Sequence, residues 1–197
     1  MRRVRTLFGL ILGALALAGC TLVPTASSPQ IIGKNHVPLG LLGPTIPGTN
    51  HGRVRFISQP VFLVDTTGHL SASSRIVPAP PVLESVLRQL VIGPTKFESL
   101  GGYTSELPKN LIVLSANFRS GIGYIDLATT LSNMSRNQEV LAVGQLVLTS
   151  RDVGITLGIH VKSIEINVAG EAQDSPIPGG HHAVLLTPAD FQSLLNA

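Results

Sequence analysis

The chain is 197 residues long, with 44% hydrophobic residues, 13% charged residues and one cysteine. This length suits one domain with additional segments, and the hydrophobic content is enough for a core and argues against general disorder. The formal net charge of +3 permits a nucleic-acid partner only if the basic residues lie in the folded part, and the single cysteine excludes a disulfide framework, a CxxC redox pair and a cysteine-rich zinc site.

The N-terminal segment has the charge and hydropathy pattern of an export signal. Arg2, Arg3 and Arg5 precede an uninterrupted apolar run over residues 7–18. This run of roughly 12 residues is too short to span a bilayer as a helix, which takes about 20. A basic start, a short apolar run and small residues before a cleavage point are typical of a signal peptide. We therefore predict a signal peptide over residues 1–19.

The signal peptide is followed by the only cysteine, in the sequence Leu17-Ala18-Gly19-Cys20. This tetrapeptide resembles the lipobox of bacterial lipoproteins, in which the cysteine receives a diacylglyceryl group and becomes the new N-terminus after cleavage. The resemblance implies a protein anchored by acyl chains such as palmitate on the extracytoplasmic face of the cell membrane. The alternatives are an ordinary secretory peptide that ends in cysteine and a buried structural cysteine. General secretion fits the sequence better than twin-arginine export.

Removal of the signal peptide changes the charge. Residues 1–19 contain three basic residues and no acidic one, so the remainder carries eleven of each sign. Without a net positive charge, nucleic-acid binding has no electrostatic basis. Residues 20–57 are rich in proline and glycine and are expected to form a linker, roughly 30–35 Å across as a flexible coil. Its apolar residues leave open whether it packs on the domain: Ile31, Ile32, Leu39, Leu41 and Leu42.

The sequence of the first half of the domain predicts a β-hairpin followed by a helix. Strands are expected over residues 61–65 and 70–77, with Gly68 in the turn between them. A helix is expected from Pro80-Pro81 to about residue 92, because its apolar residues recur on one face and Gly93-Pro94 then ends it. That face consists of Val82, Leu83, Val86, Leu87, Leu90 and Val91, and Glu84 and Arg88 form an i,i+4 pair elsewhere on the helix.

The second half repeats this order with a longer helix. Strands are expected over residues 110–116 and 121–127, then a helix from Ser135 or Asn137 to Thr149, with Ser135 and Gln138 as a capping box. A strand over residues 159–168 and a short helix starting at Thr187-Pro188 complete the chain. Strands joined by short turns and mixed with helices in this order predict an α+β fold, with a small, mainly antiparallel or mixed sheet on two main helices.

Residues 93–108 form the most distinctive motif, Gly-Pro-Thr-Lys-Phe-Glu-Ser-Leu-Gly-Gly-Tyr-Thr-Ser-Glu-Leu-Pro. Its residue types have a structural explanation. Thr95 is expected to cap a short helix while Glu98 accepts a hydrogen bond from the Thr95 backbone, and the paired glycines permit a turn with positive φ. Asp126, at the end of a strand, is expected to accept a hydrogen bond from a turn or backbone group.

The motif and its flanking elements resemble the GerMN (sporulation and germination) domain. The resemblance covers about residues 58–178, which makes residues 179–197 a C-terminal extension. The stretch 149–158 is longer than the usual connection before the last strand, which puts the alignment of that strand in doubt. The matching positions are Gly93, Pro94, Thr95, Glu98, Gly102 (or Gly101), Ser105, Pro108 and Asp126.

The sequence carries no recognised catalytic or cofactor motif, and neither a cofactor nor a metal ion is expected. His181 and His182 are adjacent and form a metal site only with a distant acid, so a solvated turn is the simpler interpretation. Glu98, Glu106 and Asp126 would serve glycan hydrolysis only if the fold paired them. We therefore expect that the protein is not an enzyme.

The GerMN resemblance implies a protein-interaction or assembly module in the cell envelope, because the domain in its founding sporulation protein resembles the ring-building motif. Envelope proteins, or further copies of the chain, are the implied partners, besides the membrane at the lipid anchor. The alternative is a sensor that binds a small ligand or a peptidoglycan fragment, which a pocket lined by Arg75, Tyr103 or Tyr124 would favour. A cell-wall hydrolase is a weaker alternative.

Overall fold

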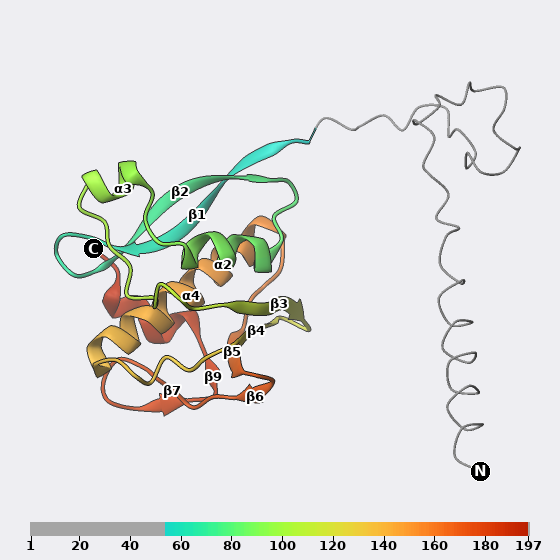
Figure 1. The fold of residues 1–197 in the computed structure, drawn as a ribbon. Coiled ribbons are helices and arrows are strands. Elements are labelled where there is room, and N and C mark those ends of the chain that lie inside the picture. Colours follow the sequence, from blue (N-terminus) through green and yellow to red (C-terminus); the bar gives the residue numbers. More distant parts are fainter. Residues whose placement is uncertain (1–53, 197) are drawn as a thin grey trace, which may run out of the picture. The chain divides into compact units, whose positions relative to one another are not determined.

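The computed structural model describes residues 54–196, in which a β-hairpin, a mixed sheet and helices follow one another along the chain (Figure 1). The predicted signal peptide, the lipobox with Cys20, and nearly all of the predicted linker lie outside the described residues. Within the described part, no helix has both the length and the apolar character needed to cross a membrane.

The first element is a long hairpin of β1 (Phe56–Val64) and β2 (Leu70–Pro78), paired antiparallel in a continuous register from Phe56–Pro78 to Val64–Leu70. The turn is closed by Asp65, whose Oδ1 accepts hydrogen bonds from the backbone N–H groups of Thr67 (2.8 Å) and His69 (3.1 Å). Gly68 has φ +82°, as expected for this turn. β1 starts five residues before the expected strand, so the predicted linker boundary at residue 57 falls inside it.

The main sheet is mixed, as predicted. Its order is β3-β4-β5-β6, and β9 pairs with the first half of β5, at Ile164 and Glu165, whereas β6 pairs with the end of β5. β4 and β5 are parallel because the long helix α4 connects them, and the other pairs are antiparallel. The strands are β3 (Val113–Arg119), β4 (Ile122–Leu127), β5 (Ser163–Val168), β6 (Glu171–Ala172) and β9 (Leu185–Leu186), and a separate short pair is β7 (Ser175–Pro176) with β8 (His182–Ala183).

Both main helices are present, although their lengths differ from expectation. α2 (Leu83–Val91) buries the predicted apolar face except Val82, which is the N-cap and is exposed. α4 (Arg136–Thr156) begins at the predicted capping box of Ser135 and Gln138 but continues seven residues beyond Thr149. The expected long connection was therefore wrong: residues 150–156 continue the helix, with Val153 and Gly154 buried, and Gly158, at φ +71°, follows the C-cap Leu157.

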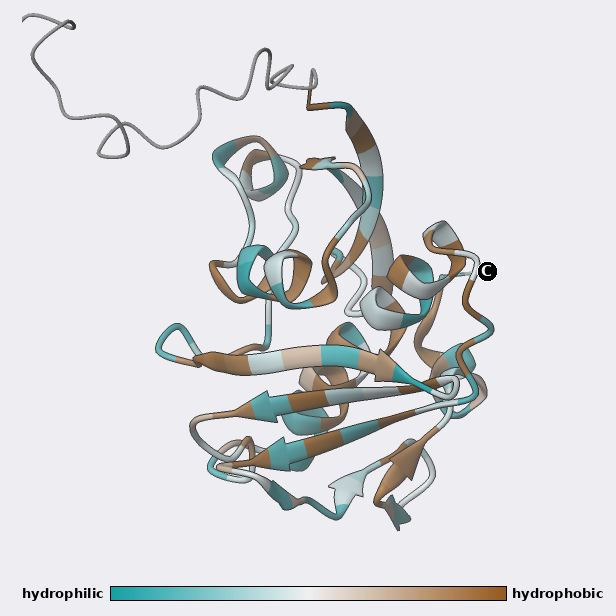
Figure 2. Ribbon diagram, turned by 90° about the vertical axis from the view of Figure 1, so that its right-hand side faces the viewer, coloured by the Kyte–Doolittle hydropathy of each residue, from teal (hydrophilic) through white to brown (hydrophobic). Residues whose placement is uncertain are grey.

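α4 packs against β1 and α2, and Figure 2 shows it behind the main sheet. One contiguous core joins the hairpin, the two helices and the sheet. Gly144 of α4 lies where this packing is closest, since a Cβ there would come within 2.7 Å of Leu70 Cδ1 and 3.1 Å of Phe191 Cδ1. The glycine thus lets α4 approach the hairpin and the C-terminal segment together.

The C-terminal residues contribute to this unit. A 3₁₀ helix (Pro188–Leu194) starts at the predicted position, with Thr187 and Asp190 as its capping box. Phe191 in this helix is fully buried, and β9 adds to the main sheet. The expected boundary at residue 178 therefore does not coincide with a break in packing.

Candidate functional site

The 93–108 motif starts where α2 ends. Gly93 adopts φ +90°, and Pro94 leads directly into α3 (Lys96–Leu100). Thr95 caps this short helix: its Oγ1 accepts the Glu98 backbone N–H at 3.2 Å, and Glu98 Oε2 accepts the Thr95 backbone N–H at 2.6 Å. The predicted capping box is therefore confirmed.

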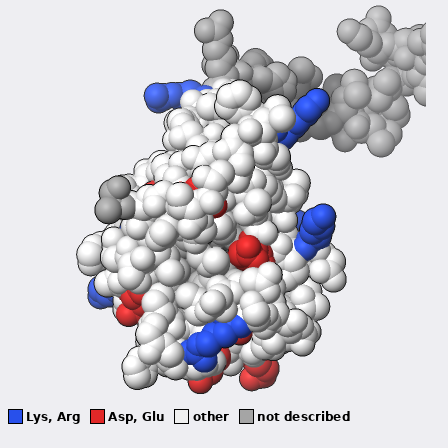
Figure 3. Space-filling view, turned by 90° about the vertical axis from the view of Figure 1, so that its left-hand side faces the viewer, with Lys and Arg blue, Asp and Glu red and all other residues white. Residues whose placement is uncertain are grey.

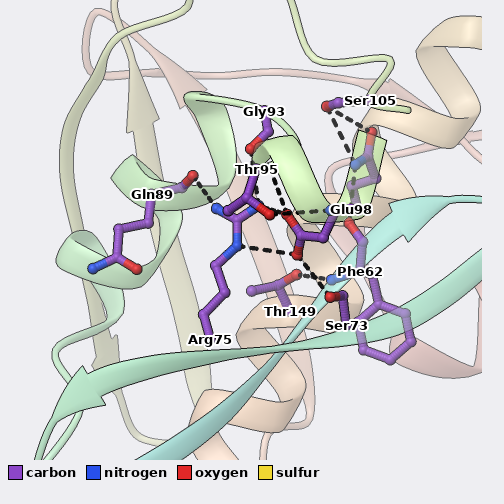
Figure 4. Close-up of polar contacts among 10 residues, drawn as sticks. Phe62, Ser73, Arg75, Gln89, Gly93, Thr95, Glu98, Ser105 and Thr149 are labelled. Atoms are coloured by element: carbon purple, nitrogen blue, oxygen red, sulfur yellow. Dashed lines mark hydrogen bonds and ion pairs between the residues drawn. The ribbon is translucent and has the colours of Figure 1, made fainter. Parts of the chain in front are cut away.

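Arg75 on β2 connects this capping box to the rest of the domain. Its Nη2 lies 2.9 Å from Glu98 Oε2, and Ser73 Oγ, on the same strand, donates to Glu98 Oε1 at 2.6 Å. The guanidinium also donates to the carbonyl oxygens of Gln89 (2.5 Å) and Gly93 (2.8 Å), at the C-terminal end of α2. Figure 4 shows these contacts converging from the hairpin and both helices. A single buried cation thus neutralises the negative end of α2 and positions α3.

The Arg75–Glu98 pair is buried, with both side chains less than a tenth exposed. Burial by itself would raise the pKa of Glu98, but the hydrogen bonds from Ser73, from the Thr95 backbone and from Arg75 outweigh it and lower this pKa to about 2. Glu98 is therefore a carboxylate across the physiological pH range. A general acid for glycan hydrolysis needs a raised pKa, so Glu98 is unsuited to that role.

The orientation of α3 is the reverse of that of an ordinary surface helix. Glu98 is its buried residue, whereas Phe97 is 87% exposed and Leu100 is 79% exposed. Ile92, just after α2, is 84% exposed. We call Ile92, Phe97 and Leu100 the α3 surface. Figure 3 views the molecule from the side that carries α3, where charged side chains are scattered over a mostly uncharged surface.

Two grooves flank the motif. The first, of about 500 Å³, is lined by motif residues and their neighbours, among them Pro94, Tyr103, Ser105 and Lys109. The second, of about 450 Å³, lies between β2 and α3 and includes Arg75. Tyr103 and Arg75 thus line different grooves, and Tyr124 lines neither of them.

A second polar network holds the end of the motif against α4. The buried Gln145 side chain accepts the Glu106 backbone N–H at 2.9 Å and donates to the Phe62 carbonyl at 2.9 Å, and Ser105 Oγ lies within hydrogen-bond distance of it. Thr149, one turn further along α4, accepts the Phe62 backbone N–H at 3.0 Å. These two side chains satisfy backbone groups of β1 that a neighbouring strand would otherwise pair. These two residues were not predicted from the sequence, although polar residues four positions apart inside an apolar stretch were a usable signal.

The remaining motif positions have local structural contacts. Gly102 has φ +84°, and the Pro108 carbonyl accepts the Leu111 backbone N–H at 3.0 Å. Asp126 Oδ1 accepts the Gly170 backbone N–H at 2.9 Å, which fixes the turn after β5 as predicted. Asp126 and Glu98 therefore belong to different networks and do not form a carboxylate pair with each other.

His181 and His182 lie beside a cation. Arg136 Nη1 is 3.2 Å from His182 Nε2, and Arg136 Nη2 donates to the His181 carbonyl at 3.2 Å. A guanidinium at this distance opposes a bound metal ion. Over residues 54–196, no group of three or more His, Cys, Asp or Glu side chains is arranged to hold a metal ion.

The fold matches that of solved GerMN domains. The first GerMN domain of the sporulation protein GerM from Bacillus subtilis aligns with 68% of this chain over 98% of its own length, with a TM-score of 0.51 and 15% identity. The tandem GerMN domains of the same protein align with 69% of this chain, with a TM-score of 0.51 and 16% identity. This chain spans only 48% of that tandem structure. The sequence matches no protein-family model and no curated protein.

Proposed function

Starting from a domain with the GerMN fold, we propose that the chain is a lipoprotein anchored through Cys20 on the extracytoplasmic face of the cell membrane, where its domain binds another envelope protein through the α3 surface. The observation that carries this proposal is the orientation of α3, which buries its carboxylate and exposes Phe97 and Leu100. The charge balance outside the signal peptide argues against nucleic acid as the partner.

The α3 surface has the properties of a binding site because it is both apolar and held in place. The capping box and the Arg75–Glu98 pair fix the helix backbone. Binding of a partner to Phe97 and Leu100 would therefore cost little further backbone conformational entropy. Aromatic residues, phenylalanine included, are enriched in protein interfaces relative to the rest of the surface, and Phe97 is 87% exposed. The area removed from water would contribute about 25 cal/mol per Å².

A crosslinking pull-down from membranes tests the surface. We expect the double substitution F97S/L100S to lose a partner that the wild-type chain captures. The matched control is I155S, because Ile155 is 65% exposed on α4, outside this surface. Equal capture by wild type and F97S/L100S would refute the proposed surface.

Membrane fractionation tests the anchor separately. Acyl chains contribute about 0.8 kcal/mol per buried CH₂, so Cys20→Ala should move the protein from the membrane to the soluble fraction. If the variant stays in the membrane fraction, the lipobox interpretation is wrong.

The first groove favours a second candidate, a sensor of small ligands or peptidoglycan fragments. It combines an aromatic ring, Tyr103, with hydroxyl groups and the Lys109 ammonium. A ligand that binds only the folded state raises the melting temperature, so a mixture of muropeptides should stabilise the wild-type protein and not Tyr103→Ala. Release of muropeptides from purified cell wall would instead identify a hydrolase.

A further inference from the structure

The contacts of β1 with α4 show which way the backbone groups of the hairpin point. The Phe62 backbone N–H bonds Thr149 and its carbonyl bonds Gln145, so both groups point away from β2. In an antiparallel pair, the residue directly opposite such a position also points its backbone groups away from its partner strand. That residue is Ala72. Even-numbered residues of β2 therefore direct their backbone groups to its outer edge.

The outer edge of β2 has free backbone groups. Ala72, Ser74 and Ile76 are exposed, and within residues 54–196 none of their backbone N–H and carbonyl groups forms a hydrogen bond. The free stretch begins after Leu70, because Leu195 pairs with Leu70. Donors and acceptors thus recur at every second residue along this edge, which is the pattern that a further β-strand can bond.

The other sheet edges in the described part of the chain carry protections that β2 lacks. β3 has a bulge between Val113 and Ser115, and each of the strands β6 to β9 has only two residues. Pro60 lies on the outer edge of β1, where it offers no N–H. β2 has nine residues in continuous register, with neither lysine nor proline before Pro78. Proteins usually block an edge of this kind, so an open one indicates a surface that pairs with another strand.

The groove of about 450 Å³ between β2 and α3 lies along this edge, with Ser74, Ile76 and Phe97 in its lining. Arg75 points to Glu98 of α3 (Figure 4), and these charged groups of the groove neutralise each other at 2.9 Å. Ile76, the next residue of β2, lies on the opposite face of the hairpin. A strand added to β2 would therefore meet the exposed Phe97 ring on one face and the exposed Ile76 on the other, without an unpaired charge.

We propose that the protein bound by the α3 surface adds an extended segment to the outer edge of β2, as a further strand with uncharged, apolar side chains against Phe97 and Ile76. An extended backbone matches the two-residue spacing of the free groups, whereas a helix bonds its own backbone groups internally. This inference rests on the proposed function for the identity of the partner as an envelope protein, and it adds the form in which that partner binds.

Two other occupants fit this edge less well. Residues 21–53 contain no run of five residues without a proline or glycine, so the predicted linker offers no regular segment to match residues 72–76. A second copy that paired antiparallel through its own β2 around Ser74 would place Pro78 of that copy opposite Leu70, where Leu195 already pairs. A strand from a different protein is free of both obstacles.

Hydrogen exchange, followed by NMR on residues 21–197, tests the pairing with a defined probe. The probe is a capped seven-residue peptide of alternating valine and threonine, which is uncharged and favours an extended backbone. At saturating peptide, exchange of the Ala72, Ser74 and Ile76 N–H groups should slow about tenfold or more, whereas Ser73 and Arg75, which face β1, should change less. The same peptide N-methylated at every residue should protect none of them, because it has no donors for the β2 carbonyls.

Three substitutions test which groups hold the peptide. Ser74→Pro should raise the dissociation constant about tenfold or more, because it removes the central N–H of the edge. Phe97→Ser should raise it about fivefold through the lost apolar contact, and this exposed position leaves the core intact. The matched control is Ser58→Pro, because Ser58 is exposed on β1 and points its backbone groups to the opposite edge of the hairpin. It should bind like wild type.

Several outcomes would overturn strand addition. Equal protection by the methylated and unmodified peptides would do so, as would no protection at the highest soluble peptide concentration. If the free chain is a dimer that Ser74→Pro dissociates, a second copy occupies the edge and the proposal is wrong. If the peptide protects the edge only after residues 21–53 are removed, the linker occupies it and the proposal is also wrong.

The envelope partner and the strand addition fail separately. If the pull-down captures no partner through the α3 surface while the peptide protects the edge, strand addition stands and the envelope partner is wrong. If the pull-down depends on Phe97 and Leu100 while the peptide gives no protection, the α3 surface binds its partner in another form and strand addition is wrong.

Discussion

The α-helices α3 and α4 each begin with a capping box, as the C-terminal 3₁₀ helix also does, and the boxes of α3 and α4 differ in their contacts with the rest of the domain. Ser135 and Gln138 at the start of α4 are exposed, and their hydrogen bonds serve that helix end alone. At the start of α3, Thr95 is also exposed, but Glu98 is buried and additionally binds Ser73 and Arg75 from the hairpin. The capping box of α3 thus also links the helix to the hairpin, because its carboxylate, Glu98, pairs with the buried cation Arg75.

The largest expected effect comes from removing that cation. Arg75→Met leaves the Glu98 carboxylate buried without its partner, and the Gln89 and Gly93 carbonyls lose a donor. We expect the free energy of unfolding, measured by urea denaturation, to fall by about 3–5 kcal/mol. A loss below about 1 kcal/mol would show that water or other groups replace the guanidinium and that the two capping boxes are energetically alike.

Acid should lower the stability contributed by the α3 capping box more than that contributed by the α4 capping box, because Glu98 titrates and Gln138 does not. The pKa of Glu98 is about 2 in the folded protein, below its ordinary value of 4.5, so the folded state binds fewer protons. The resulting stability is fully present above about pH 5 and is lost as the pH falls from about 4.5 towards 2, by about 2–3 kcal/mol. Glu98→Gln removes this component.

The measurement is the difference in unfolding free energy between wild type and Glu98→Gln at several pH values, because other groups, such as Asp65 with its lowered pKa, cancel in that difference. The difference should shrink as the pH falls. A difference independent of pH would contradict the shifted pKa.

Removing the caps themselves compares the two boxes directly. Thr95→Ala should cost about 1–2 kcal/mol, because it also disturbs the buried Glu98, and Ser135→Ala about 0.5–1 kcal/mol. Thermal and urea unfolding of both variants would check this order. Equal costs would mean that the Thr95 hydroxyl acts on α3 alone.

The smallest effect is expected at an exposed ion pair of the same charges. Arg88 pairs with Glu84 at 2.9 Å, but both side chains are more than a third exposed. Arg88→Met should therefore change the unfolding free energy by no more than about 0.5 kcal/mol. This variant is the matched control for Arg75→Met, since each removes one arginine from an ion pair of nearly the same length.

Local patterns in the sequence predicted much of the fold. The turn at Gly68, the ends of α2 at Gly93 and the three caps at Thr95, Ser135 and Thr187 each depend on contacts between near neighbours. The far end of α4 was not predicted, because residues 150–156 contain only two large apolar residues, Val153 and Ile155, and a glycine, Gly154, so their sequence shows no apolar stripe that separates a helix from a loop.

The candidate site was predicted only in its local part. The capping role of Glu98 followed from its spacing to Thr95, whereas its partner Arg75 lies 23 residues earlier in the chain. Gln145 was missed for the same reason, since it contacts residues 40 and 83 positions away. No spacing rule connects residues at such separations.

The sequence by itself determined the α+β order, the capping boxes and the basic, apolar N-terminal segment, because these follow from contacts and patterns within a few residues. Only the tertiary structure decided that α3 would bury Glu98 and expose Phe97 and Leu100. The hydropathy of these side chains alone would predict the opposite orientation, with Phe97 and Leu100 in the core and the carboxylate in water. The fold reverses this preference because Arg75 and Ser73 supply the charge and hydrogen bonds that a buried carboxylate requires.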